Sequence, residues 1–267
     1  MPDFTAQDVK RLRDATGAGM MDAKRALTES DGDFEAAGKW LREKGLGKAA
    51  ERAGRENVEG AVALAKFDNV AALVQLKCET DFVAKSPDFV NVANDLAELV
   101  AKEGEGAASQ KADAIDDLRI TLKENIELGQ VVRVEATGGQ VLDTYLHVQG
   151  GRGVNGVVVV IDGGDQELAH DIAVHIAFAK PSVLRRDDVP AERVAEEREA
   201  FLKETQNEGK PEAAWEKIVD GKLNGWFKRA PGGALLEQPY AKDDKKSVQQ
   251  VLGGASVVTF AQLLIGE

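Results

Sequence analysis

The sequence predicts an α+β protein with an N-terminal three-helix module, a duplicated β-β-α-β core with antiparallel sheets, and an inserted helical hairpin. Three observations predict this fold. Short amphipathic segments separated by glycines fill the first part of the chain. Two apolar segments joined by a turn precede an amphipathic helix, and this pattern occurs twice. Two charged helical segments flank a Gly/Pro turn. We place the module at residues 1–54, the first core unit at 55–139, the second at 140–182 and 229–267, and the hairpin at 183–228.

Each helix of the module has a predicted start or stop. Thr5 is a good N-cap for the first helix. The pair Met20-Met21 follows on a predicted loop, and Asp22 is expected to cap the second helix. Gly45 and Gly47 are expected to end the third helix. Three short helices have a thin apolar core, which is typical of a small binding unit.

The core pattern alternates strands and helices. In the first unit, Asp68-Asn69 joins two strands, and Ser86-Pro87 opens a strongly amphipathic helix. In the second unit, a glycine-rich turn joins two strands, and a helix follows Asp162. The predicted strands are 58–67, 71–78 and 130–136 in the first unit and 140–149, 154–161 and 256–264 in the second.

The hairpin begins where Pro190 opens a charged helix, and its return helix carries Trp215 and Trp226. A face rich in tryptophan needs an apolar surface to pack on. That surface is either a partner subunit or the protein's own core, and the sequence leaves both open.

Composition limits the functions that this chain can have. It has 267 residues, a hydrophobic content of 43% and a net charge of -12. Such an acidic chain lacks the basic footprint for a nucleic-acid backbone, and aromatic residues make up only 5% of it, so we expect no direct nucleic-acid partner. The single cysteine, Cys78, cannot form an internal disulfide, which favours a reducing, cytoplasmic setting. The Met1–Phe4 start has no basic segment, and no apolar run approaches the ~20 residues of a membrane span.

No group of residues has the pattern of a catalytic site. His170 and His175 lie five positions apart on a predicted helix, which does not place them on one face as a metal pair. Cys78 ends a strand without a nearby histidine or basic cluster in the sequence, which favours a packing role. His147 is either a structural histidine or a contact residue. We therefore expect neither an enzyme nor a bound metal or cofactor.

The segment Cys78–Lys85 places Asp81 beside Phe82 on a turn between a strand and a helix. An exposed phenyl ring is unfavourable unless something buries it, and a neighbouring carboxylate opposes burial. The pair is either a local plug or a wedge directed at a partner, and the surrounding chain favours the wedge.

At this point the sequence closely resembles the bacterial translation elongation factor Ts family. The resemblance is collinear along nearly the whole chain. It rests on the segments 12–27 (Leu-Arg-Asp-Ala-Thr-Gly-Ala-Gly-Met-Met-Asp-Ala-Lys-Arg-Ala-Leu), 80–85 (Thr-Asp-Phe-Val-Ala-Lys), 208–211 (Glu-Gly-Lys-Pro) and 236–240 (Leu-Glu-Gln-Pro-Tyr). It implies a guanine nucleotide exchange factor that binds the GTPase elongation factor Tu in its GDP form, displaces Mg²⁺ and promotes GDP release.

The resemblance also implies roles for the parts of the chain. The module resembles a ubiquitin-associated domain that docks on the GTPase, and the hairpin resembles a dimerisation-type insert, so a homodimer or heterotetramer is possible. Mg²⁺ dislocation falls on Thr80, Asp81, Phe82 and Val83. Supporting contacts fall on His147, Met20, Met21 and Lys24. The alternative is a ubiquitin-associated-like adaptor or scaffold without exchange activity, which has no need for the segment 80–85.

Overall fold

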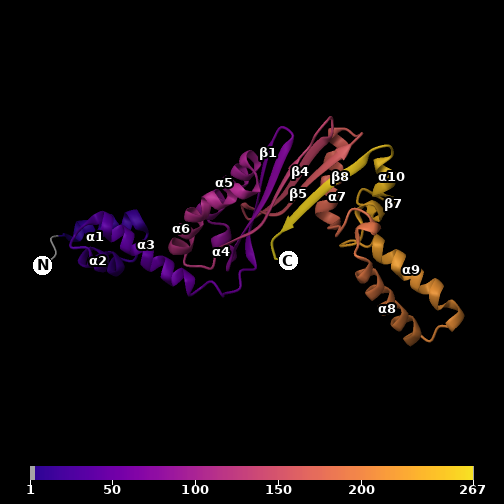
Figure 1. Cartoon of the computed structure of the whole chain (residues 1–267), viewed down its shortest axis with the longest axis horizontal. Helices are drawn as coiled ribbons and strands as arrows, with labels where there is room; N and C mark the ends of the chain where they lie inside the picture. The colour runs from indigo at the N-terminus through magenta and orange to yellow at the C-terminus, as the bar shows by residue number, and fades with distance from the viewer. Residues whose placement is uncertain (1–3, 267) are drawn as a thin grey trace.

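The computed structural model describes residues 4–266, so the expectation for the Met1–Phe4 start lies almost entirely outside the described residues. The protein is elongated (Figure 1). The three N-terminal helices form one end, two small sheets with their covering helices form the middle, and the helical hairpin forms the other end. This arrangement confirms the predicted α+β class.

The N-terminal helices are α1 (Ala6–Thr16), α2 (Met20–Glu29) and α3 (Phe34–Ala50). The capping box at the start of α1 is formed, because Thr5 and Asp8 bond to each other's backbone N–H groups. The three helices share a small apolar core. Its buried members are Val9, Leu12, Ala23, Ala26, Leu27, Ala37 and Leu41.

Two local predictions for this module are wrong. Met20 and Met21 lie in the first turn of α2, because the N-cap is Gly19, and Asp22 therefore lies within the helix. The helix α3 continues past Gly45 and Gly47 to Ala50. The reason at Gly45 is packing: a Cβ there would lie 2.8 Å from Ile120 Cγ2, so the glycine permits close helix contact.

The first sheet is antiparallel, as predicted, and its strand order is β1-β2-β3. Its strands are β1 (Glu59–Phe67), β2 (Val70–Cys78) and β3 (Glu127–Glu135). The helices α5 (Pro87–Glu103) and α6 (Ala112–Leu122) pack on its outer face. A single helical turn, α4 (Asp81–Ala84), and the 3₁₀ helix η1 (Glu105–Lys111) complete this unit.

The second sheet repeats this topology, with the antiparallel order β4-β5-β8. Its strands are β4 (Val141–Gln149), β5 (Arg152–Asp162) and β8 (Ser256–Leu264), and α7 (Gln166–Ala179) covers its outer face. The inner faces of the two sheets pack together through a third apolar cluster. Its buried members are Val62, Ala71, Leu73, Ala136, Leu142, Val158, Val160 and Leu263.

The hairpin consists of α8 (Ala191–Asn207) and α9 (Trp215–Lys228), which extend away from the sheets (Figure 1). Backbone bonds hold its base closed, including Gly232 N–H to Lys180 O at 2.8 Å and Leu235 N–H to Val183 O at 2.9 Å. The remaining elements are η2 (Arg186–Asp188), η3 (Glu212–Ala214), η4 (Leu235–Glu237), β6 (Pro239–Tyr240), β7 (Asp243–Ser247) and α10 (Val248–Leu252). No helix within residues 4–266 is long and apolar enough to cross a membrane.

Candidate functional site

The segment between β2 and α5 presents a bare phenyl ring to solvent. Thr80 is the N-cap of α4, and its hydroxyl accepts a bond from the N–H of Val83 at 3.3 Å. Phe82 is 83% exposed, whereas Val83 packs against the core of the first sheet. The ring is therefore not a plug for this protein's own interior. We name the segment Thr80–Lys85 the exposed turn.

One carboxylate holds the start of the exposed turn. Glu124 Oε2 accepts bonds from the backbone N–H groups of Glu79 and Thr80 at 3.0 and 3.1 Å. Its Oε1 accepts the Thr80 hydroxyl at 2.6 Å. Below the turn, the Cys78 thiol donates to Thr80 O at 3.2 Å. Sequence reasoning missed Glu124, which follows the end of α6 and carries no local signal for this role.

A neighbouring lysine on the exposed turn keeps the Asp81 carboxylate ionised. Lys85 Nζ lies 2.5 Å from Asp81 Oδ2, one helical turn away. This hydrogen bond lowers the pKa of Asp81, and the positive charges of Lys85 and Arg152 lower it further. Asp81 is therefore ionised at neutral pH. Burial raises the pKa of Cys78 to about 12, so the thiol is neutral, consistent with the predicted packing role.

The second sheet contributes the turn between β4 and β5. Lys85 lies against Gly150 in that turn, where a Cβ would sit 2.9 Å from Lys85 Cε. Arg152 is buried and reaches back to β1, donating to Gly60 O at 2.5 Å and Glu59 Oε2 at 2.7 Å. Both duplicated units therefore form the surroundings of the exposed turn.

His147 lies near the end of β4, close in sequence to Gly150, and it is exposed. It forms no side-chain hydrogen bond or ion pair with the residues that the structure describes, so it is available for contact. The other two histidines have structural partners: His170 Nδ1 lies 2.8 Å from Asp143 Oδ2, and His175 is buried against Gln238. Within residues 4–266, no group of three or more His, Cys, Asp or Glu could hold a metal ion.

The module carries a second exposed surface. Met20 and Met21 are 44% and 75% exposed in the first turn of α2. Lys24 is exposed one turn later, on the same side of the helix. This surface lies at the N-terminal end of the molecule, apart from α4 in the middle (Figure 1). The structure therefore does not bring the two predicted sets of contact residues together.

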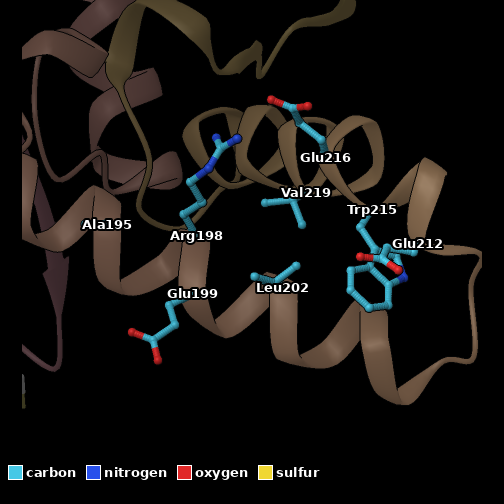
Figure 2. Close-up of a pocket in the computed structure, with 8 residues that line it drawn as sticks. All are labelled: Ala195, Arg198, Glu199, Leu202, Glu212, Trp215, Glu216 and Val219. Atoms are coloured by element: carbon cyan, nitrogen blue, oxygen red, sulfur yellow. The ribbon is translucent and has the colours of Figure 1, made fainter.

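The hairpin carries a third candidate surface, a cleft of about 500 Å³ between α8 and α9. Its apolar side chains, Leu202, Val219 and Trp215, face the space between the helices, with charged groups around them (Figure 2). Trp215 Nε1 donates to Lys210 O at 2.8 Å. The other tryptophan of this face, Trp226, packs edge-on against Phe227 at the hairpin base. The predicted tryptophan face is therefore divided between base and tip.

Comparison with known proteins finds relatives that match along the whole chain. A family model described as "Elongation factor TS" matches residues 79–267. The protein named Elongation factor Ts in Clavibacter sepedonicus is 44% identical over 280 residues, with 100% of both chains covered. Its namesakes in Streptomyces coelicolor and Renibacterium salmoninarum are 43% and 42% identical, again with 100% of both chains covered.

Elongation factor Ts is a nucleotide exchange factor of translation and not an enzyme that makes or breaks covalent bonds. The predictions of a role in protein biosynthesis and of a non-enzymatic protein are therefore confirmed by the relatives. The match of the family model to residues 79–267, together with identities above 40% over complete relatives, shows that this chain belongs to the elongation factor Ts family.

Proposed function

We propose that this protein binds elongation factor Tu in its GDP form, displaces the nucleotide-bound Mg²⁺ and so promotes GDP release. The observation that carries the proposal is the exposure of Phe82, at 83%, on a turn whose backbone is held rigidly. An aromatic ring presented in this way is unfavourable in the free protein and gains free energy when a partner buries it.

The energetics set what the exposed turn must do. A GTPase that binds GDP with nanomolar affinity holds it by about 12 kcal/mol. An exchange factor lowers the affinity of the GTPase for GDP only if it binds the nucleotide-free GTPase more tightly than the GDP-bound form. By linkage, GDP then lowers the affinity of the GTPase for the exchange factor by the same factor. Burial of Phe82 contributes about 1.5–3 kcal/mol toward this difference, provided that the pocket for the ring opens only when Mg²⁺ leaves.

Asp81 supplies the second part of the proposal. It is ionised and half-buried beside Phe82, so it enters the partner as a hydrogen-bond acceptor. There it competes for the donors that order the water shell of the metal. Thr80 and Val83 position these two side chains, and His147, from the neighbouring sheet, supports the same contact.

The module supplies docking. Met20 and Met21 are flexible, polarisable side chains that adapt to an apolar partner surface, and Lys24 lies beside them. Because this surface lies apart from the exposed turn, its contacts hold the GTPase without depending on the nucleotide state. Docking energy from the module therefore leaves the exposed turn free to discriminate between the two states.

The experiment is a stopped-flow measurement of fluorescent GDP release from elongation factor Tu in the presence of Mg²⁺. We expect Phe82→Ala to fold normally and to slow release at saturating factor by roughly 10–150-fold, which corresponds to the lost burial of the ring. Phe178→Ala is the matched control, because Phe178 is 74% exposed on α7. Equal rates for Phe82→Ala and wild type would remove the exposed turn from the mechanism. Binding of the GTPase without faster release by wild type would support the adaptor alternative.

A further inference from the structure

A small cavity of about 210 Å³ lies where the N-terminal module meets α6. Four cationic side chains line it, Lys44, Lys48, Arg52 and Lys123, against the single carboxylate of Asp22. The remaining lining residues are Gly17, Ala18, Gly19, Leu41, Gly45 and Ile120. In a chain with a net charge of -12, this concentration of positive charge is unusual and needs a physical reason.

The positive charges are only partly neutralised within the protein. Asp22 serves two lysines at once, with Lys44 Nζ at 2.7 Å and Lys48 Nζ at 3.8 Å. Lys123 forms no ion pair with any residue in the described range 4–266. Side-chain charges around the cavity therefore leave an excess of positive charge for a ligand.

Arg52 adds an unsatisfied donor. Its Nη2 donates to Arg119 O at 2.8 Å, which anchors the guanidinium at the cavity wall. Its Nε is buried and has no hydrogen-bond partner among the described residues. A buried donor without a partner costs free energy, and an anion in the cavity can remove that cost.

The backbone groups at the cavity also favour a negatively charged ligand. The loop Gly17–Gly19 lines it and leads into α2, whose N-cap residue Gly19 provides no side-chain cap. Free N–H groups and the helix dipole at such an end favour negative charge. This feature adds to the four cationic side chains and does not by itself define the site.

We propose that this cavity binds a small phosphate-bearing anion at the joint between the module and the core. A phosphate group offers several charged acceptor oxygens to lysine and arginine donors that surround one space. The cavity is smaller than the ~300–1,000 Å³ of pockets for drug-sized ligands, so it takes a phosphate chain and not a whole nucleotide. A bound anion would link α3 and Lys123 to the loop that precedes Met20 and Met21.

The test is calorimetric titration of the full chain with pyrophosphate, orthophosphate and GDP, each at the same ionic strength and without Mg²⁺. We expect saturable binding of one pyrophosphate and about tenfold weaker binding of orthophosphate, which carries less charge. GDP binding as tight as pyrophosphate would identify a nucleotide's phosphate chain as the ligand, and GDP binding much weaker would identify the free anion. Titrations that do not saturate with any of the three would overturn the proposal.

Substitutions with opposite expected effects on pyrophosphate binding sharpen the test. Lys48→Gln and Lys123→Gln each remove a charged donor, and we expect each to weaken pyrophosphate binding about tenfold. Asp22→Asn removes the competing carboxylate, and we expect it to tighten binding, a direction that a purely structural role would not produce. Lys39→Gln is the control, because Lys39 is exposed on α3 outside the cavity. Equal weakening by Lys39→Gln and Lys48→Gln would mean diffuse attraction and no site, and thermal melts establish that each variant is folded.

Discussion

At the scale of single residues, the shape of the exposed turn depends on one carboxylate. Glu124 accepts three hydrogen bonds from the two residues that precede α4, all between 2.6 and 3.1 Å. A turn held in this way presents Phe82 in a fixed orientation before any partner arrives. Such preorganisation lowers the ordering cost of association. Glu124 is therefore a positioning residue, and it acts through the backbone of the exposed turn.

We expect Glu124→Ala to slow the maximal rate of GDP release by about tenfold, because the exposed turn loses three hydrogen bonds, two of them from backbone N–H groups. Glu124→Gln keeps one acceptor oxygen and should retain part of the activity. Glu51→Ala serves as the control, since Glu51 is exposed in the segment after α3. Stopped-flow release and the affinity for the GTPase are measured together: a change in affinity alone, with the maximal rate intact, would contradict a role in the turn.

The exposed turn itself was predictable from the sequence, and its supports were not. An acid beside a phenyl ring after an apolar strand is a local pattern, and so is the lack of a histidine or basic cluster around Cys78. Glu124 and Arg152 lie 44 and 92 positions from their backbone partners at Thr80 and Gly60. No periodicity in a single sequence reports a contact at that separation, because the contact depends on how the sheets and α6 pack.

At the scale of secondary-structure elements, the two glycines Gly45 and Gly47 within α3 differ in their surroundings. The sequence predicts a helix stop at Gly45 and Gly47, yet the helix continues through both to Ala50. At Gly45 the missing side chain admits Ile120 of α6, whereas nothing lies within 4 Å of a Cβ at Gly47. Local propensity favoured a stop, and tertiary packing of the helix against α6 overrode it.

We expect alanine substitutions at these two glycines to change the stability of the protein in opposite directions. Gly45→Ala should destabilise the protein by about 1–3 kcal/mol, because its Cβ would meet Ile120 Cγ2 at 2.8 Å and Cγ1 at 2.9 Å. Gly47→Ala should stabilise it by about 0.5–1 kcal/mol, because alanine favours the helix and meets no neighbour. Urea unfolding followed by circular dichroism and by tryptophan fluorescence, which includes Trp40 on α3, measures both. Stabilisation by both variants would show that the Ile120 side chain moves aside at little cost, and destabilisation by Gly47→Ala would contradict the helix-propensity argument.

The contact between α7 and the hairpin base includes a buried histidine, and this makes the free energy of unfolding depend on pH. His175 is buried on α7, its Nε2 lies 3.1 Å from Gln238 Oε1, and its Nδ1 accepts the N–H of Ala241 at 3.2 Å. Gln238 in turn donates to the carbonyls of Ala179 and Arg229. Burial lowers the pKa of His175 below its usual 6.5, although the bond to Gln238 opposes the shift.

Because the folded state resists protonation of His175, the unfolded chain binds more protons as the pH falls below about 6.5. The free energy of unfolding should therefore decrease from that pH downward, by at most about 1.4 kcal/mol per pH unit from this group. We expect the free energy of unfolding of His175→Gln to be lower than that of the wild type at pH 8 but to decrease less between pH 8 and pH 5.5. The control is His147→Gln, a change at an exposed histidine, for which we expect the same decrease as in the wild type. Urea unfolding at pH 8 and pH 5.5 tests this, and parallel losses in wild type and His175→Gln would exclude His175 as the cause.

At the scale of the whole molecule, three surfaces lie along one elongated body. The module surface is at one end, the exposed turn is near the middle, and the hairpin cleft is at the other end (Figure 1). The duplicated sheets explain this spacing, because they pack face to face and leave the module and the hairpin to extend outward. The two sheet units were predictable from their repeated pattern, whereas their packing on each other was not. The division of the chain at residues 54, 139, 182 and 228, and the likeness of the module to a ubiquitin-associated domain, stay predictions.

The last prediction concerns association through the hairpin, which we propose as the contact of a homodimer. The cleft between α8 and α9 is lined by the half-buried Leu202 and Trp215 within a charged rim, an apolar surface that association would cover (Figure 2). Leu202→Glu places a charged group on the apolar surface of that cleft and should weaken self-association at least tenfold in sedimentation equilibrium, because association would have to take the carboxylate out of water. Phe178→Glu makes the same kind of change at an exposed ring on α7 and should leave association unchanged. A wild type that stays monomeric across the accessible concentration range would refute the proposed contact, and loss of association in both variants would assign it to general surface hydrophobicity.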